Sequence, residues 1–240
     1  MKRNCFSISV IVIKYGYMKS IQEYSEIISS INNNLGSARL MAVSKTRSVE
    51  EIDAVFRAGV TLFGENHVQE IVQKFTSYRP SGLELHMIGH LQSNKVTKVV
   101  PLVDMIESVD SLPLLEKINS CAEKNGKIMN VLLEYNTSGE ESKSGFQSED
   151  SLFGCIEQAI KMKYIRLKGL MTVGPLEHPE RTEEAFSFLH SLFERCREKY
   201  SLSDFDVLSM GMSHDWELAV RQGSTEVRIG TAIFGERKYV

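Results

Sequence analysis

Short apolar runs recur along the chain, and segments with helical periodicity separate them. The runs lie at residues 40–43, 61–64, 85–89, 104–107, 129–134, 167–173, 205–210 and 226–230. Runs of this length without polar alternation are typical of strands that are buried on both faces. Between them, patterns such as Phe186, Leu189 and Phe193 on one face of a charged segment predict helices. About eight strands alternating with helices predict an α/β protein with a single (β/α)8 TIM barrel, whose functional site lies at the carboxyl ends of the strands.

A helix is predicted ahead of the first strand. Ser20 and Glu23 have the spacing of a capping box, apolar residues between 21 and 35 form one face, and Gly36 can end the helix. Ser48 and Glu51 repeat the capping-box spacing after the first strand. The leading helix therefore carries its own start signal and does not need the residues before it.

Residues 1–17 are interpreted as an extension of the domain. An apolar segment at 6–13 follows Lys2 and Arg3, as in a secretory signal, but Lys14 interrupts it and no small-residue cleavage site follows. Met18 directly precedes the leading helix and is a candidate start residue. The prediction is an N-terminal extension over 1–17, either not native or disordered, and one barrel domain over 18–240.

The composition limits the partners and the compartment. Lysine and arginine number 28 against 31 aspartates and glutamates, and the formal net charge is -3. Because the chain has no basic block or stripe, nucleic acid and anionic membranes are not expected partners. No apolar run approaches the roughly 20 residues of a membrane span. The four cysteines are scattered without a C-x-x-C pair, which favours a reducing compartment, here the cytoplasm, over a disulfide framework.

The first strand ends in Ser44 and Lys45, which places a primary amine at the mouth of the barrel. An amine must lose its proton before it can attack an aldehyde, and an ammonium group loses it more readily at a dry rim than in water. Taken alone, this strand end favours a lysine that only extends into solvent. Lys45 is therefore a candidate carbonyl-capturing residue whose support must come from the other strand ends.

The last two strands end in residues suited to an anion. Ser209, Gly211 and Ser213 lie where the seventh strand turns into a helix, and helix N-terminal amides favour negative charge. On the eighth strand, periodicity places Arg228 and Gly230 on one face. An arginine that faces into a barrel is costly unless it is paired or faces a ligand.

Two further residues complete the predicted binding site. Thr231 adds a hydroxyl beside the seventh-strand serines, and Asn66, after Gly64 at the end of the second strand, brings both a donor and an acceptor. A small ligand with an aldehyde and a phosphate would use Lys45 and the anion-binding residues together. Pyridoxal 5'-phosphate (PLP) is the main candidate, and a phosphosugar captured by an aldolase-type lysine satisfies the same requirements.

Two other patterns are more typical of ordinary structural roles. His86 and His90 have the i, i+4 spacing of a metal pair, but Gly89 places them at a strand-to-loop junction. No metal site is predicted. Residues 213–215 contain the residue types of a hydrolase triad, but such close neighbours cannot readily reach a shared geometry, and no G-x-S-x-G elbow is present.

Six motifs at these strand ends occur in a specific order. They are Ala-Val-Ser-Lys-Thr at 42–46, Phe-Gly-Glu-Asn at 63–66, His-Met-Ile-Gly at 86–89, Leu-Gln-Ser-Asn-Lys at 91–95, Leu-Ser-Met-Gly-Met-Ser at 208–213 and Gly-Ser-Thr-Glu-Val-Arg-Ile-Gly-Thr-Ala-Ile-Phe-Gly at 223–235. The set resembles the pyridoxal phosphate homeostasis proteins, also called the proline-synthase co-transcribed family, over nearly the whole chain from Met18 onward. The resemblance implies a fold-type III barrel similar to the N-terminal domain of alanine racemase.

The same resemblance implies roles for individual residues. PLP would be held on Lys45 as an internal aldimine, with Arg228 towards the pyridine nitrogen and Asn66 near the ring. The cofactor phosphate would lie against Ser209, Gly211, Ser213, Gly230 and Thr231. No residue is assigned a catalytic role.

The function implied is PLP binding in vitamin B6 homeostasis, by carrying or buffering the cofactor and delivering it to PLP-dependent apoenzymes. An arginine beside the pyridine nitrogen disfavours its protonation and weakens the ring as an electron sink. Racemases of this fold use a second base from an added domain, and no such domain is expected here. The alternative is a weak PLP-dependent amino-acid racemase or lyase, in which Lys45 abstracts an α-proton. A monomer or weak dimer is expected.

Overall fold

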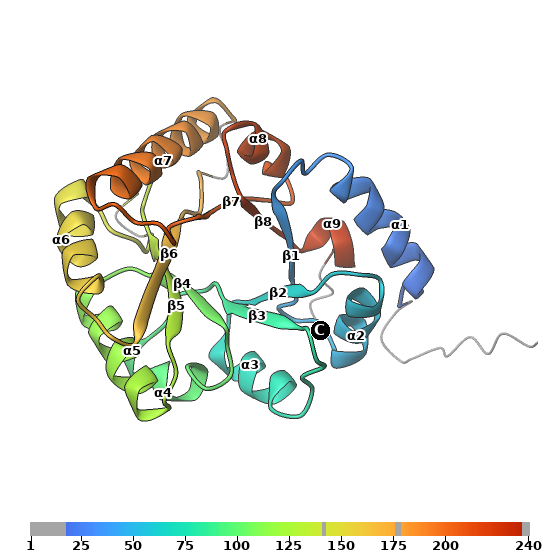
Figure 1. The fold of residues 1–240 in the computed structure, drawn as a ribbon. Helices are drawn as coiled ribbons and strands as arrows, with labels where there is room; N and C mark the ends of the chain where they lie inside the picture. Colours follow the sequence, from blue (N-terminus) through green and yellow to red (C-terminus); the bar gives the residue numbers. More distant parts are fainter. Residues whose placement is uncertain (1–17, 141–142, 176–178, 237–240) are drawn as a thin grey trace, which may run out of the picture.

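The computed structural model describes residues 18–140, 143–175 and 179–236. Eight parallel strands form a closed barrel in chain order from β1 to β8, and β8 pairs with β1 to close it. Figure 1 shows this ring of strands surrounded by helices. The closed barrel confirms the predicted fold class. The extension predicted at residues 1–17 lies outside the described residues.

The observed strands differ from the predicted apolar runs by one or two residues at most. They are β1 (Arg39–Val43), β2 (Leu62–Glu65), β3 (Glu84–Met87), β4 (Met105–Val109), β5 (Met129–Glu134), β6 (Ile165–Met171), β7 (Val207–Met212) and β8 (Glu226–Ile229). The helices are α1 (Ile21–Asn32), α2 (Val49–Arg57), α3 (Val68–Phe75), η1 (Ser93–Lys95), α4 (Val96–Val99), α5 (Leu112–Lys124), α6 (Glu149–Ala159), α7 (Pro179–Lys199), α8 (Trp216–Arg221) and α9 (Thr231–Phe234).

The predicted helix starts are confirmed by their hydrogen bonds. Ser20 caps α1 and Ser48 caps α2, and each forms a full capping box with the glutamate three residues later. Each box satisfies amide groups that have no partner within the helix. Helix α1 ends at Asn32, before the predicted stop at Gly36, which adopts a positive φ of 58° in the following turn.

The core is divided by the barrel wall. The main hydrophobic cluster fills the layer between the strands and the surrounding helices and includes Ala42 and Phe63. Their neighbours Met41 and Leu62 belong to a second cluster, because successive strand residues point to opposite faces. Charged side chains share the barrel interior with these smaller clusters, as described below.

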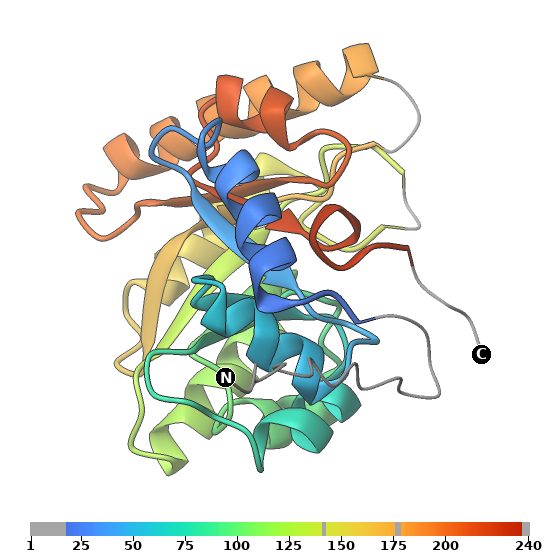
Figure 2. The same ribbon diagram turned by 90° about the vertical axis from the view of Figure 1, so that its right-hand side faces the viewer.

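Helix α1 packs against two other helices outside the barrel. Helix α1 lies next to α2 and α9 on the outside of the barrel, as the side view in Figure 2 shows. Tyr24 of α1 and Phe234 of α9 meet edge to face, with ring centroids 6.1 Å apart. No helix in the described part of the chain has both the length and the apolar character needed to cross a membrane.

Candidate functional site

Lys45 lies directly after β1, at the carboxyl end of the barrel, and is half-buried. Val43 faces the barrel interior with Met41, whereas the buried Ser44 contacts Glu65 on the outer side of the wall. The Ser44 amide continues the parallel pairing by donating to the Gly64 carbonyl at 3.0 Å. The strand thus delivers Lys45 to the mouth of the barrel, as the sequence predicts.

Asn66 follows β2 at the same end of the barrel. Its side-chain oxygen Oδ1 is buried and accepts no hydrogen bond from any of the described residues. The neighbouring backbone is close: a Cβ atom built at Gly89 would lie 2.3 Å from the Asn66 carbonyl oxygen. A glycine is therefore needed at position 89, and the Asn66 carboxamide keeps an acceptor for a ligand donor.

Ser213 and the start of α9 form a polar corner between β7 and β8. Ser213 Oγ accepts from the amides of Gly230 at 3.2 Å and Ala232 at 3.4 Å. A Cβ atom at Gly230 would lie 3.3 Å from the Val43 carbonyl oxygen, so this corner touches the end of β1. The structure therefore brings Ser213, Gly230 and the exposed Thr231 to the rim that carries Lys45.

The other two residues predicted for the anion site have different surroundings. Gly211 has a φ of +97°, and a Cβ atom there would lie 2.5 Å from Ala219 Cβ, so this glycine permits close packing of α8. Ser209 lies four residues before Ser213 on β7 and is fully buried. Its hydroxyl donates to Glu107 Oε2 at 2.6 Å. The structure does not bring the Ser209 and Ser213 hydroxyls together, and a phosphate contact for Ser209 stays a prediction.

Arg228 faces the barrel interior, as strand periodicity predicts, and is 4% exposed. Its Nη1 donates to Ser209 Oγ at 2.6 Å and its Nη2 donates to the Thr172 carbonyl at 2.7 Å. The Ser209 hydroxyl in turn donates to Glu107, which supplies the compensating negative charge. The guanidinium group is thus held by Ser209, which the sequence predicted for the phosphate, and by the Thr172 carbonyl, whereas Glu107 was not singled out by the sequence pattern.

These contacts belong to a longer chain of polar side chains, here called the inner ionic network, which is buried except at Arg39 and Glu84. It consists of Arg39, Glu84, His86, Glu107, Ser209, Glu226 and Arg228. His86 lies at its centre, with Nδ1 2.7 Å from Glu107 Oε1 and Nε2 2.9 Å from Glu84 Oε1. Since both ring nitrogens face carboxylate oxygens, both must carry a proton, and His86 is an imidazolium ion.

The pKa values of the inner ionic network follow from this geometry. Burial alone would lower the pKa of His86, but its hydrogen bonds to Glu107 and Glu84 raise it to about 10. Burial, together with the nearby Glu107 carboxylate, raises the pKa of Glu226 to about 8. Neither side-chain oxygen of Glu226 has a hydrogen-bond partner among the described residues. Glu226 therefore carries a proton at neutral pH.

Three side chains of this network have the spacing of metal ligands. Within the described ranges, ligand atoms of His86, Glu107 and Glu226 lie within 4.8 Å of one another. A metal ligand needs a free lone pair on the imidazole, and the two carboxylate contacts of His86 leave none. His90 is exposed and pairs instead with Asp110 at 3.2 Å. The geometry favours a protonated histidine over a metal centre.

Glu134 is a site residue that the sequence reasoning missed. It ends β5 and shares strand parity with Leu132, which packs inside the barrel against Met105 and Met171. Burial, and then the nearby Asp110 carboxylate, raise the pKa of Glu134 to about 7. The period of two along β5 was the signal that could have placed this carboxyl group at the mouth of the barrel.

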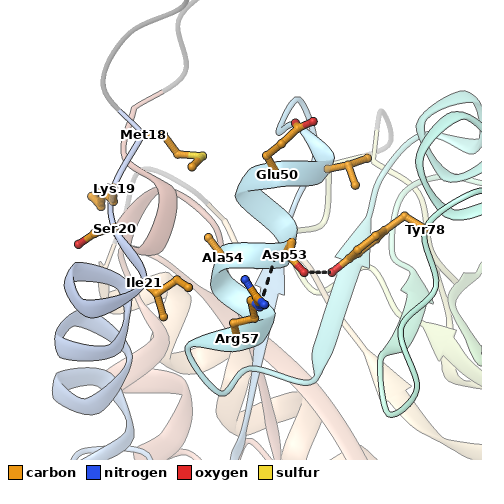
Figure 3. A pocket seen from close by; sticks show the side chains of 10 residues that line it. Met18, Lys19, Ser20, Ile21, Glu50, Asp53, Ala54, Arg57 and Tyr78 are labelled. Atoms are coloured by element: carbon orange, nitrogen blue, oxygen red, sulfur yellow. Dashed lines mark hydrogen bonds and ion pairs between the residues drawn. The ribbon is translucent and has the colours of Figure 1, made fainter. Parts of the chain in front are cut away.

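A surface cavity of about 540 Å³ lies away from these residues, between α1 and α2 (Figure 3). In it Asp53 accepts from the Tyr78 hydroxyl at 3.1 Å and lies 3.7 Å from the Arg57 guanidinium. None of the predicted binding residues lines it. This cavity is therefore not the predicted binding site, whose reactive groups lie at the mouth of the barrel.

Comparison with known proteins identifies the family. Residues 21–238 match a family model described as "Alanine racemase, N-terminal domain". A pyridoxal phosphate homeostasis protein from Aquifex aeolicus is 40% identical over 203 residues, covering 84% of this chain and 88% of the relative. This chain belongs to the pyridoxal phosphate homeostasis protein family. The human member is 39% identical over 212 residues, covering 84% of this chain and 77% of the relative.

Solved structures agree with this membership. PipY from Synechococcus elongatus, in a structure described as having PLP bound, superposes with a TM-score of 0.80 at 32% identity. The match covers 88% of this chain and all of PipY, 100%. An alanine racemase from Clostridium difficile has a TM-score of 0.74 at 17% identity, covering 92% of this chain and 58% of the racemase. That second likeness concerns the fold alone.

Proposed function

We propose that this family member binds PLP at the mouth of its barrel through Lys45 and takes part in PLP homeostasis. One observation carries the proposal: the Ser213–Gly230 corner touches Val43, two residues before Lys45. An amine and an anion-binding corner on one rim suit a small ligand with an aldehyde at one end and a phosphate at the other. The PLP-bound structure of PipY, whose whole chain matches 88% of this one, supports the same interpretation.

The residues at the mouth fit such a ligand. The buried Oδ1 of Asn66 lacks a hydrogen-bond donor within the described part of the chain, and a polar ligand can supply one. The Ser213 oxygen accepts the Gly230 and Ala232 amides, which leaves its O–H proton to donate to a phosphate oxygen, with Thr231 exposed beside it. Gly211 and Ser209 remain proposed contacts of the phosphate. Ser209 accepts a hydrogen bond from Arg228, the residue proposed to face the ligand ring.

When bound, the cofactor supplies an aldehyde whose carbon forms a C=N bond with a primary amine, while the aldehyde oxygen leaves as water carrying both amine hydrogens. The protein's part is to hold Lys45 at the rim and to orient the ligand between Asn66 and Ser213. Glu107 compensates the buried guanidinium group of Arg228 through Ser209. An arginine facing the ligand ring donates hydrogen bonds and cannot give up a proton, which favours storage of the cofactor over carbanion chemistry.

The further aspects of this function are proposals of the same kind. We propose that the chain carries or buffers PLP in the cytoplasm, releases it to PLP-dependent apoenzymes and acts as a monomer or weak dimer. The barrel is proposed to form one domain over 18–240. Transfer from the loaded protein to a PLP-dependent apoenzyme, followed by the gain of that enzyme's activity, tests the carrier role. If the enzyme gains no more activity from the loaded protein than from an equal amount of free PLP, the carrier role is contradicted and storage is the only role left.

The binding proposal is tested by trapping. Purified protein is incubated with PLP, reduced with borohydride and digested for mass spectrometry. A pyridoxyl adduct is expected on Lys45, and Lys45→Ala should lose it. Lys127→Ala is the matched control, because Lys127 lies just before β5, at the opposite end of the barrel, and donates to the Val100 and Val103 carbonyl groups. Absence of an adduct, or an adduct on another lysine only, contradicts the proposal.

Glu134 favours a second candidate function, a weak racemase or lyase. Its carboxyl group lies at the barrel mouth with a pKa of about 7, suitable for accepting and returning a proton near neutral pH. Exchange of the α-hydrogen for deuterium is measured across a panel of amino acids with the loaded protein. Exchange above that of free PLP, lost in Glu134→Gln, supports an enzyme. Exchange equal to that of free PLP excludes it.

A further inference from the structure

The two peptide groups that flank the α-carbon of Lys45 are both tied to one buried lysine, Lys74 of α3. Lys74 Nζ donates to the Ser44 carbonyl oxygen at 2.9 Å, which holds the peptide group before Lys45. It also donates to Glu70 Oε2 at 2.6 Å. The same Glu70 oxygen accepts the Thr46 amide at 2.6 Å, which holds the peptide group after Lys45.

Glu65 completes this arrangement, here called the outer ionic network (Ser44, Thr46, Glu65, Glu70 and Lys74). Glu65 Oε1 accepts from Lys74 Nζ at 2.9 Å and from the Ser44 hydroxyl at 2.8 Å. The Lys74 side chain is 9% exposed and that of Glu65 is fully buried. An ammonium group has three N–H donors, and Ser44, Glu65 and Glu70 accept all three. Lys74 is therefore a fixed structural cation and not a second candidate for the attacking amine.

The loop would not hold this shape by itself. Thr46 has a φ of +66°, in the left-handed region that β-branched residues avoid. Its amide is held there by Glu70. Burial tends to raise the pKa of Glu70, but hydrogen bonds from Lys74 and the Thr46 amide bring it below its ordinary value. The tertiary contact with α3 thus maintains a backbone conformation that local preference opposes.

We propose that Lys74 is a positioning residue for Lys45, acting directly on Ser44 and through Glu70 on Thr46. By fixing both flanking peptide groups it fixes the point and direction from which the Lys45 side chain leaves the backbone. The ε-amine then searches a smaller volume at the barrel mouth, and capture of an aldehyde is faster. This inference rests on the proposed function, since it assigns Lys74 a part in the same capture.

Three variants separate the contacts. Lys74→Met keeps the length of the side chain and removes all three donors. Glu70→Ala removes the acceptor that Thr46 and Lys74 share but leaves the Lys74 contacts with Ser44 and Glu65. The Glu70 side chain is 20% exposed, so this variant keeps the test usable if Lys74→Met does not fold. Glu70→Gln retains an oxygen that can accept the Thr46 amide. Lys127→Met is the matched control, because it also removes lysine contacts to backbone carbonyls, those of Val100 and Val103.

Two readouts are used at a temperature at which every variant is folded. The first is hydrogen exchange of the Thr46 amide without cofactor, expected to be about 10-fold faster or more in Lys74→Met and Glu70→Ala. The second is the rate at which PLP forms a borohydride-trapped adduct on Lys45, expected to be about 10- to 100-fold slower in the same variants. Glu70→Gln should stay within about threefold of the unmodified protein, and Lys127→Met should match it in both readouts.

The outcomes are distinguishable. Faster exchange with slower capture supports the positioning role, whereas faster exchange with unchanged capture overturns it and leaves Lys74 a purely structural residue. An unchanged Thr46 exchange rate in both Lys74→Met and Glu70→Ala also overturns it. If neither the unmodified protein nor Lys127→Met forms an adduct on Lys45, the proposed function itself fails, and the positioning role fails with it.

Discussion

Two ionic networks lie on opposite sides of the barrel wall. One holds the side chain of Arg228, and the other holds the backbone around Lys45. The inner ionic network joins side chains from Arg39 at one end of the barrel interior to Arg228 below the mouth, where Arg228 also donates to the Thr172 carbonyl. The outer ionic network, around Lys74, ends on backbone atoms of Ser44 and Thr46. Burying charge costs free energy in both networks. The inner network positions the Arg228 guanidinium group, and the outer network positions the loop that carries Lys45.

The difference teaches which property each network controls. Side chains in the inner network have pKa values of about 8 for Glu226 and about 10 for His86, so pH changes its charge. The outer network bonds to the peptide groups on both sides of Lys45, so it fixes the shape of the backbone there. We therefore expect the inner network to set the electrostatics under the mouth and the outer network to set the geometry of Lys45. Four predictions test this division, from the largest effect to the smallest.

Replacing His86 should have the largest effect. His86→Leu removes the cation between Glu84 and Glu107, and it leaves the buried Glu107 carboxylate with only the Ser209–Arg228 contact as compensation. The free energy of unfolding at pH 7 should fall by about 3–5 kcal/mol, measured by urea denaturation. A loss below about 1 kcal/mol would mean that the histidine does not hold the network together.

Glu226→Gln should reveal the titration of the inner network. Burial raises the Glu226 pKa from 4.5 to about 8, so the folded protein holds this proton more strongly than the unfolded chain. The stability of the unmodified protein should therefore fall as the pH rises from about 4.5 through about 8. Glutamine cannot lose a proton, so the variant should be more stable at pH 9 by on the order of 2–4 kcal/mol, with a smaller difference at pH 5.

Urea denaturation at both pH values measures the Glu226→Gln effect. Glu65→Gln is the counterpart in the outer network, where burial also raises the carboxyl pKa but Lys74 lies within 2.9 Å. Its stability difference should change less between pH 5 and pH 9. An equal pH dependence in the two variants would contradict the division between the networks.

A matched pair of serines gives the next largest effect. Ser209 bridges two groups of the inner network, Glu107 and Arg228, whereas Ser44 donates its hydroxyl to Glu65 alone. Ser209→Ala should cost about 2–3 kcal/mol and Ser44→Ala about 1–1.5 kcal/mol, because hydrogen bonds to charged groups contribute more when two are lost. Thermal and urea unfolding compare them, and the reverse order would show that Ser209 does not link the two charges.

Ser48→Ala calibrates the scale outside both networks. The Ser48 hydroxyl accepts the Glu51 amide at 3.3 Å and caps α2. Its loss should cost about 1 kcal/mol at any pH between 5 and 9, because no buried charge is involved. A pH-dependent cost comparable to that of Glu226→Gln would mean that global unfolding, and not the inner network, titrates in this range.

The fold could be read from the sequence because its signals are local. Apolar runs with the length of buried strands and the capping boxes at Ser20 and Ser48 depend only on neighbouring residues. The location of Lys45, Asn66, Ser213 and Gly230 at one rim was predictable for the same reason, since the carboxyl ends of parallel strands meet there. Glu134 was missed because its strand was read for apolar content and not for which face each residue occupies.

The sequence by itself determined the barrel, the strand ends and the chemical types at the mouth, because periodicity and capping act over a few residues. Only the tertiary structure decided that Ser209 belongs with Glu107 and Arg228, at 2.6 Å from each, and not with Ser213. It also decided that Lys74, in a later helix, holds the loop of Lys45. Burial makes unpaired charge costly, so buried charges take their partners from whichever strand or helix closes over them, a choice that sequence spacing does not encode.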